Sequence, residues 1–389
     1  MRLILTVNYS PWSRYSGGGQ HSTHHLAGAL ARRGHRVSVV YTKPPWERVQ
    51  TPGGLPYDVR WAAFCGLRSS RTAPLRVLNA WTVARTVASM LAEEPVDVVH
   101  CQGEEGALLP RLRGRRRDFY IVVTARYPGY PRQRWVRSPK YRAMGHLVRY
   151  ADARCTTSNA SRALLARAFG VDPRETHVVP NGVDPVFTEV IRAACARHGP
   201  IVFFGRIERS KGVDTLIEAL SRLHEINDLP VVVIGRGGWE RAARESAARL
   251  GLTSRLEFPG WLDRDALASV LATARLAVLP SREESFGNAM VEAMAAGVPV
   301  LSTSVGSILE VTDNGRAARV VPADDPGRLA RAIAELVSDP DGAEALGERG
   351  RAFVVGAFSW SRAAADYERI YTALARADRR ERAGLGAAE

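Results

Sequence analysis

The 389-residue sequence contains few cysteines and no long apolar run. Its four cysteines, Cys65, Cys101, Cys155 and Cys195, are widely separated and include no C-x-x-C pair, which excludes a disulfide framework and a cysteine-based zinc site. No stretch of about 18 apolar residues occurs, and the apolar start of the chain ends too soon for a secretory signal. We therefore expect a cytoplasmic protein without membrane-spanning helices.

Lysine is scarce, and acidic residues are too few in one half to balance the basic ones. Only three lysines occur, Lys43, Lys140 and Lys211, so arginine carries most of the positive charge. Residues 1–190 contain 28 Lys or Arg and 13 Asp or Glu, a balance of +15, whereas residues 191–389 contain 26 and 27, a balance of −1. The whole excess of +14 thus lies in the first half, which favours an anionic partner.

The most basic stretch is residues 111–149, with twelve basic side chains against one acid, Asp118. Aromatic residues are interleaved with them, among others Tyr127, Tyr130 and Trp135. Three interpretations are open: a solvated face, a pocket for a phosphorylated ligand, or a surface that docks on an anionic membrane, which the aromatic residues favour. No nucleic-acid-binding module is recognised, so we expect no nucleic-acid partner.

Apolar strand patterns alternate with helix patterns along the chain. The runs at residues 2–7 and 36–41 are joined by a glycine-rich turn and an amphipathic helix, a βαβ unit that requires parallel strands. A second series begins at residues 201–205 and 231–235. Because each strand is a continuous apolar run, helices should cover both faces of its sheet. We predict an α/β protein with two Rossmann-like, doubly wound parallel sheets that bind ligands at the carboxyl ends of their strands.

The boundary between the two predicted domains lies where strand patterns pause. Residues 185–199 lack a strand pattern and mark the change in charge balance. We place one domain at 1–187 and the other at 188–359. An amphipathic helix is expected at 360–375, and residues 376–389 are expected to form a disordered tail.

The segment PSREESFGNAMVEAMAAGVPV carries the densest group of residues suited to chemistry. Glu284 follows a predicted strand, Ser285, Phe286 and Gly287 open a helix, and Glu292 lies within that helix. The first N–H groups of a helix suit a phosphate, and a glycine leaves room for close approach. The two carboxylates are suited to accept hydrogen bonds from sugar and ribose hydroxyls. A capped helix with one solvated and one buried acid is the alternative.

This segment resembles the E-x-F-G-x-x-x-x-E-A signature of the retaining glycosyltransferases of family 4, which have the two-domain GT-B fold. The resemblance extends over nearly the whole chain. It includes GGGQ…LAGALARRGHRVSVV (17–40), VDVVH (96–100), TTSNASRALL (156–165), VVPNGVDPVF (178–187), FFGRIERSKGVDTLIEAL (203–220) and FSW…Y (358–367). It implies that two domains face a central cleft, the N-terminal one for the acceptor and the C-terminal one for the nucleotide sugar, with the last helix packed back on the N-terminal domain.

In this family a basic pair after the first strand of the second domain grips the donor diphosphate, and the matching residues are Arg206 and Lys211. An arginine offers a planar fork and a lysine a compact point charge for phosphate oxygens. Gly235 and Gly237 match the family's glycine turn beside the nucleotide. A solvated loop and a plain tight turn are the alternatives for these two pairs.

Residues of the first domain match the family less closely. Gly17 and Gly18 align with its glycine loop, which approaches the donor phosphate or the acceptor, and Gln20 stands where the family often has Glu. His100 ends a strand and matches the family's first-domain His, but Gln102 replaces the second His of the common H-x-H pattern. Structural roles are the alternative for both segments.

Arg126 is the sharpest departure from the family. The family usually has a His at this position, facing the acceptor and the reacting sugar carbon. An arginine cannot act as a base near neutral pH, but it is suited to orient an anionic acceptor or to neutralise the leaving diphosphate. The substitution also leaves open a chain that binds donors and transfers poorly.

The resemblance implies retaining transfer of a sugar from a nucleotide-diphosphate donor, with Glu284, Arg206, Lys211, Arg126 and His100 as candidate catalytic residues. Donor binding is assigned to Gly17, Gly18, Gly235, Ser285, Phe286, Gly287 and Glu292. No metal or other cofactor is expected, since the donor site has no DxD-like motif. The expected acceptor is a lipid-linked or cell-surface glycan precursor, reached by peripheral binding to the inner membrane face. The alternatives are a phosphorylase or epimerase of the same fold and a non-catalytic scaffold that binds nucleotide sugars.

Overall fold

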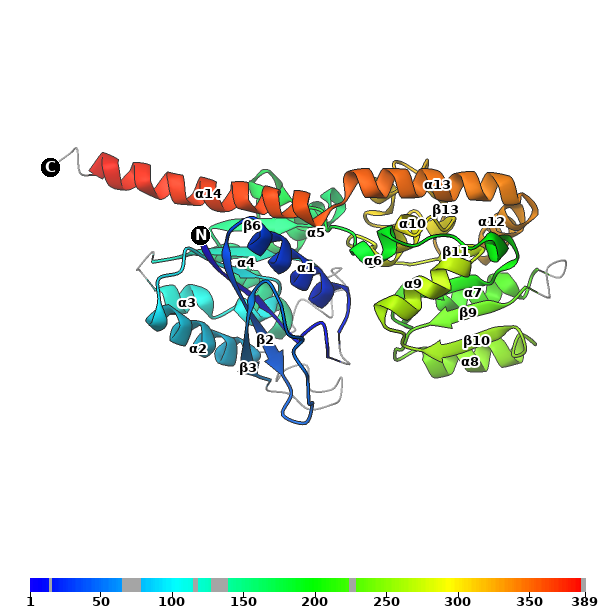
Figure 1. The fold of residues 1–389 in the computed structure, drawn as a ribbon, viewed down its shortest axis with the longest axis horizontal. Coiled ribbons are helices and arrows are strands. Elements are labelled where there is room, and N and C mark those ends of the chain that lie inside the picture. Colours follow the sequence, from blue (N-terminus) through cyan, green and yellow to red (C-terminus); the bar gives the residue numbers. More distant parts are fainter. Residues whose placement is uncertain (14–15, 65–77, 115–117, 127–138, 224–228, 386–389) are drawn as a thin grey trace. The chain divides into compact units, whose positions relative to one another are not determined.

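The computed structural model describes residues 1–13, 16–64, 78–114, 118–126, 139–223 and 229–385. The chain divides into two compact units, each built on its own sheet (Figure 1). The first unit comprises Met1–Gly182 and Trp360–Glu389, and the second comprises Val183–Ser359. The predicted boundary after residue 187 is a few residues too late, because Val183 and Phe187 belong to the core of the second unit.

The first unit contains a seven-stranded parallel sheet in the order β3-β2-β1-β4-β5-β6-β7. Its strands are β1 (Arg2–Val7), β2 (Arg36–Lys43), β3 (Asp58–Ala63), β4 (Val98–Cys101), β5 (Tyr120–Thr124), β6 (Ala153–Thr156) and β7 (Thr176–Val178). The edge strand β3 was not predicted. Most of its side chains are exposed or half-buried, so it lacks the continuous apolar run that marks the inner strands.

Helices cover both faces of this sheet, as the apolar strands require. They are α1 (Gly18–Arg32), α2 (Leu78–Glu93), α3 (Leu109–Arg113), α4 (Pro139–Tyr150), α5 (Asn159–Phe169) and α14 (Trp360–Leu385), with short 3₁₀ turns at Glu104–Gly106 and Pro173–Glu175. One apolar core contains Leu26 and Leu30 of α1 with Tyr371 of α14, and a second core contains Val87 of α2 with Leu147 of α4. The last helix is therefore part of the first unit.

Helix α14 is longer than the sequence predicted. It continues past residue 375 to Leu385, so the prediction of a disordered tail is wrong for residues 376–385, and residues 386–389 lie outside the described part. The segment contains four arginines and two alanines and no proline, a composition that favours helix. No helix in the described residues is long and apolar enough to span a bilayer.

The second unit contains a six-stranded parallel sheet in the order β10-β9-β8-β11-β12-β13. Its strands are β8 (Ile201–Phe204), β9 (Val231–Ile234), β10 (Leu256–Gly260), β11 (Leu276–Leu279), β12 (Val300–Thr303) and β13 (Arg319–Val321). Its helices are α6 (Pro185–Thr188), α7 (Val213–Leu220), α8 (Glu240–Arg249), α9 (Arg264–Thr273), α10 (Asn288–Ala295), α11 (Ile308–Val311), α12 (Pro326–Ser338) and α13 (Pro340–Ala357), with 3₁₀ turns at Ala194–His198 and Arg209–Lys211. The prediction of two Rossmann-like parallel sheets is confirmed.

Helix α13 was not predicted, because its sequence contains several glycines, which disfavour helix. Two features of the fold account for it. Asp339 caps its first turn by accepting a hydrogen bond from Gly342 N at 3.0 Å. A Cβ at Gly347 would lie 2.4 Å from Gly297 O, so this glycine lets the helix pack directly on a neighbouring backbone. Tertiary packing thus overrides a weak local preference.

Candidate functional site

Lys211 and Glu284 form an ion pair at the carboxyl edge of the second sheet. Lys211 ends the short turn that follows β8, and Glu284 lies in the loop that follows β11. Because β8 and β11 are neighbours in the sheet, their loops meet, and Lys211 Nζ donates to Glu284 Oε1 at 2.6 Å. Ser281 Oγ donates to the same carboxylate oxygen at 2.9 Å. The structure thus brings together two predicted catalytic residues, both with side chains at most 20% exposed.

Glycines allow the loops of this site to pack backbone against backbone. Gly212, directly after Lys211, has a φ of +70°, and a Cβ there would lie 1.9 Å from Pro280 O. At Gly235 a Cβ would lie 1.8 Å from Gly205 O. The backbone packing alone therefore explains why Gly235 must be glycine, whatever else it contacts.

Arg282, which the sequence analysis did not single out, fastens the loop that carries Lys211. Its guanidinium donates to both carboxylate oxygens of Asp214, at 2.6 and 3.0 Å, and its backbone N donates to Ser210 O at 2.8 Å. The bidentate geometry fixes the guanidinium firmly. Arg206, in contrast, is exposed, and its guanidinium has no recorded partner within the described part of the chain. Arg282 therefore orders the loop, while the exposed side chain of Arg206 extends from it.

The predicted phosphate-binding segment starts helix α10. Gly287 is the N-cap of this eight-residue helix and has a φ of +85°, a conformation that favours glycine. Ser285 and Phe286 precede it in the sequence. Phe286 is only 4% exposed and packs edge-on against Phe358, with ring centroids 5.4 Å apart. Its ring thus anchors the loop in the apolar core.

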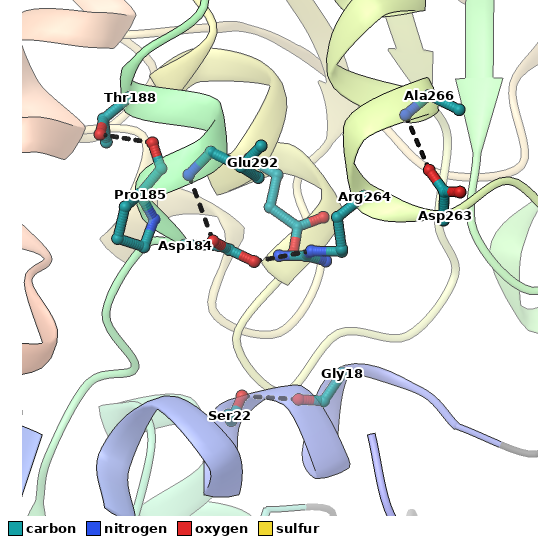
Figure 2. A network of polar contacts seen from close by, with 10 residues as sticks. Gly18, Ser22, Asp184, Pro185, Thr188, Asp263, Arg264, Ala266 and Glu292 are labelled. Atoms are coloured by element: carbon teal, nitrogen blue, oxygen red, sulfur yellow. Dashed lines mark hydrogen bonds and ion pairs between the residues drawn. The ribbon is translucent and has the colours of Figure 1, made fainter. Parts of the chain in front are cut away.

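Glu292 is held by an arginine that bridges three helices. Arg264 Nη1 donates to Glu292 Oε1 at 2.9 Å, and Arg264 Nε donates to Asp184 Oδ2 at 2.8 Å (Figure 2). The other oxygen of Asp184 accepts from Val186 N and so caps α6. The guanidinium also lies over the ring of Phe187, 4.5 Å from its centroid. Sequence reasoning missed Arg264 and Asp184, because nothing in their local sequence indicates a contact across 80 positions.

At the carboxyl edge of the first sheet, Gln20 orders the glycine loop. Its Oε1 accepts a hydrogen bond from Gly17 N at 3.0 Å, and its Nε2 donates to Asn8 O at 2.6 Å. Gly17 and Gly18 thus lie at the cap and the first residue of α1. In the described residues, the N–H groups of Gly18 and Gly19 have no recorded acceptor, as is usual in the first turn of a helix.

Arg126 lies beside this loop at the end of β5. Its Nε donates to Gln102 Oε1 at 2.8 Å, and its Nη1 donates to Asn181 Oδ1 at 2.6 Å. A Cβ at Gly19 would lie 3.8 Å from Arg126 Cδ, so the side chain passes the first turn of α1. Burial lowers the pKa of the Arg126 guanidinium, which nevertheless stays charged near neutral pH. Hydrogen bonds of Arg126 therefore join Gln102 and Asn181, two residues that are far from it in the sequence.

His100, a predicted catalytic residue, is fully buried, and both of its ring nitrogens have hydrogen-bond partners. Its Nδ1 lies 2.7 Å from Tyr371 Oη and its Nε2 lies 2.7 Å from Thr124 Oγ1. Burial, with a smaller effect of the Arg126 charge, lowers the pKa of His100 to about 3. The neutral ring thus ties α14 to β5, and it does so through Tyr371, which lies 271 positions away in the sequence.

Glu105 is a buried acid that the sequence analysis also missed. Its Oε1 accepts hydrogen bonds from Thr6 Oγ1 at 3.1 Å and from Gln102 N at 3.2 Å. Burial, and second the neighbouring Glu104, raises the pKa of Glu105 to about 8. Near neutral pH this carboxyl is therefore largely protonated and contributes little negative charge to the sheet edge.

The basic stretch 111–149 is described only in part, and Tyr127, Tyr130 and Trp135 lie outside the described residues. Of its described basic side chains, Arg113 pairs with Asp152, Lys140 lies 3.6 Å from Glu104 Oε1, and Arg126 turns inward. Three of them, Arg111, Arg142 and Arg149, are exposed. The described residues contain no group of three or more His, Cys, Asp or Glu side chains placed to hold a metal ion.

Comparisons with known proteins agree with this architecture. Residues 16–187 match the family model "Glycosyltransferase Family 4", and residues 198–353 match "Glycosyl transferases group 1". A glycogen synthase of Mycobacterium tuberculosis is 30% identical over 97% of this chain and 96% of its own length. Sucrose-phosphate synthase from Thermosynechococcus elongatus, 22% identical, superposes with a TM-score of 0.83 over 97% of this chain and 99% of its own. HepE of Anabaena in complex with UDP-glucose, 17% identical, has a TM-score of 0.75 over 96% of this chain and 100% of its own.

Proposed function

The chain belongs to glycosyltransferase family 4, and on that premise we propose that it transfers a hexose from a nucleotide-diphosphate sugar to a glycan precursor with retention of anomeric configuration. The observation that carries the proposal is the pair of Lys211 and Glu284, 2.6 Å apart where two neighbouring strands end. A cation suited to phosphate thus lies directly beside a carboxylate suited to sugar hydroxyls. The complex of HepE with UDP-glucose supports a donor of this class.

The donor residues have distinct roles in this proposal. Lys211 and Arg206 bind the diphosphate, with the N-terminus of α10 at Gly287 as a further source of positive potential. When the diphosphate takes Glu284's place as the partner of Lys211, Glu284 becomes able to accept hydrogen bonds from the sugar. Glu292, oriented by Arg264, accepts hydrogen bonds from the ribose hydroxyls through its second oxygen.

The transfer step follows from these roles. The bond between the anomeric carbon and the diphosphate oxygen breaks, and the acceptor oxygen bonds to the same face of that carbon. The acceptor's proton passes to the departing phosphate oxygen, so no side-chain base is required. The burial of His100 fits this step, since its ring nitrogens are both occupied. Catalysis then rests on stabilising the charge that develops on the leaving diphosphate.

We also propose that transfer needs no divalent metal, because Lys211 and Arg206 supply the positive charge on the diphosphate. The enzyme is expected to keep its activity in EDTA. Activity that EDTA removes and Mg²⁺ restores would contradict this point.

For the acceptor we propose a lipid-linked or cell-surface glycan precursor, used by a cytoplasmic enzyme at an anionic membrane surface. The charge of +15 in residues 1–190 and the exposed Arg111, Arg142 and Arg149 support it. The protein should float with anionic liposomes at low salt and stay unbound with neutral ones. Equal behaviour with both kinds of liposome, or no change when the three arginines are replaced by glutamine, would contradict it.

The experiment that tests the proposed function is nucleotide release from a panel of nucleotide sugars in the presence of membrane extract. One donor should support release, and the anomeric configuration of the product, read by NMR, should match that of the donor. Release without a new glycoside would contradict transfer, and an inverted product would contradict retention.

A further inference from the structure

Arg126 carries a positive charge that no carboxylate in the described part of the chain neutralises. Its two recorded partners, Gln102 and Asn181, are neutral amides that accept through their oxygens. The acid that acts on it through space, Glu105, is mostly protonated near neutral pH, since burial raises its pKa to about 8. A partly buried guanidinium without an anionic partner costs free energy that a bound anion would recover.

Other donors without acceptors gather at the same place. Gln102 is only 5% exposed, and because its Oε1 is turned to Arg126, its Nε2 is left beside the guanidinium with no hydrogen-bond partner in the described structure. The N–H groups of Gly18 and Gly19 add two more donors beside Arg126.

This set consists of donors only, and it comes from three separate parts of the chain. A guanidinium supplies a planar fork, an amide supplies its NH2 group, and the start of a 15-residue helix supplies backbone N–H groups with positive potential. Donors from several directions suit the tetrahedral oxygens of a phosphate better than the planar oxygens of a carboxylate. The two amide oxygens hold the guanidinium in place, so binding needs little reordering.

We infer that Arg126, Gln102 and the first turn of α1 form a binding site for a phosphate group of the acceptor, which is then a phosphorylated carbohydrate. The inference rests on the proposed function and narrows its acceptor class. Arg126 would hold the acceptor's phosphate, while the donor's diphosphate would be held by Lys211 and Arg206, which belong to the second unit.

The test is titration of the full chain with inorganic phosphate, glucose 6-phosphate, glucose and UDP, followed by calorimetry. The variants are Arg126→Gln, Arg126→Lys, Lys211→Ala and the control Arg167→Gln, which replaces an exposed arginine of the same unit. Phosphate and glucose 6-phosphate should bind wild type and R167Q equally, and K211A should retain their binding at Arg126. R126Q should weaken their binding by about 10- to 100-fold, the usual worth of a hydrogen bond to a charged group, whereas R126K should keep part of it.

Asn181→Asp provides a second variant that leaves Arg126 in place. Its carboxylate would neutralise the guanidinium at the 2.6 Å contact, so it should weaken phosphate binding without removing a packed side chain. Loss of binding in both R126Q and N181D, with unchanged circular dichroism, supports the phosphate site.

Three outcomes would overturn the inference. Phosphate that binds R126Q as well as wild type would exclude Arg126 from the site. Phosphate binding that K211A abolishes and R126Q retains would assign the anion to the donor's diphosphate site. If UDP binds in a Lys211-dependent way and phosphate does not bind at all, the proposed function stands, but the inferred binding site for an acceptor phosphate is wrong. Absence of UDP binding and of nucleotide release with every donor of the panel would instead contradict the proposed function.

Discussion

Two charged sites, one in each unit, hold their cations in opposite ways. In the second unit, Lys211, Arg264 and Arg282 each pair with carboxylates, at distances of 2.5 to 2.9 Å. In the described part of the first unit, the hydrogen-bond partners of Arg126 are two neutral amides, and the nearby Glu105 is mostly protonated. These cations of the second unit are therefore neutralised without a ligand, and Lys211 must exchange Glu284 for the diphosphate when the donor binds. The first unit leaves one charge to be neutralised from outside.

The largest effect is expected for Lys211→Ala. Removing this cation should cost about 2–4 kcal/mol of transition-state stabilisation, because the developing charge on the diphosphate loses its nearest compensation. Steady-state turnover with the identified donor measures it. Arg209→Ala, which removes an exposed arginine of the same turn, is the matched control and should stay near wild type. Equal rates in K211A and wild type would remove Lys211 from the site.

Glu284→Gln should lower kcat/KM by roughly 10- to 100-fold, the effect of losing a charged hydrogen-bond acceptor. The fold should be unaffected, since the carboxylate is partly exposed and its partners are side chains. The neighbouring Glu283→Gln is the control. If E284Q and E283Q behave alike, the sugar contact assigned to Glu284 is wrong.

Arg264→Gln should raise the donor KM by roughly 10-fold while kcat changes little, because the residue orients Glu292 and does not touch the reacting atoms. Arg264→Lys should restore part of the affinity. Arg244→Gln is a matched control, since Arg244 also pairs with a glutamate and lies over a phenylalanine ring in the same unit. A fall in kcat at unchanged KM would contradict the orienting role.

The last prediction concerns the pH dependence of stability. Since the pKa of Glu105 is raised to about 8, the folded state holds a proton between pH 6.5 and 8 that the unfolded chain has lost, so stability should fall as pH rises. The slope is at most about 1.4 kcal/mol per pH unit. His100 opposes this fall near pH 6.5, because burial keeps its folded ring neutral while the unfolded ring, with a pKa of about 6.5, is still half protonated. This opposing contribution fades as the pH approaches 8.

Unfolding curves at pH 6.5 and pH 8 for wild type, Glu105→Gln and the exposed control Glu93→Gln measure this slope. The E105Q variant should lose the slope, and E93Q should keep it. A slope that survives in E105Q would assign it to another group.

The sequence predicted the two parallel sheets because their inner strands are continuous apolar runs, but it did not reveal which charged residues meet. Lys211 and Glu284 were each identified, yet their pairing depends on β8 and β11 being neighbours. The contact of His100 with α14 was not predicted, because only the folded chain places that helix against the strand end. Arg264 and Asp184 were missed for the same reason, since only the folded chain brings them together. Local patterns thus predict elements and loops, while long-range contacts decide the role of each side chain.

The exchange of partners at Lys211 is the central claim, and the affinity of UDP for wild type, Lys211→Ala and Glu284→Gln tests it most directly. UDP carries the diphosphate without the sugar, so Glu284 has no sugar to bind. Its remaining effect is to compete with the diphosphate for Lys211. The account predicts weaker binding to K211A and tighter binding to E284Q than to wild type, measured by calorimetry. Binding that weakens in E284Q as much as in K211A would contradict it.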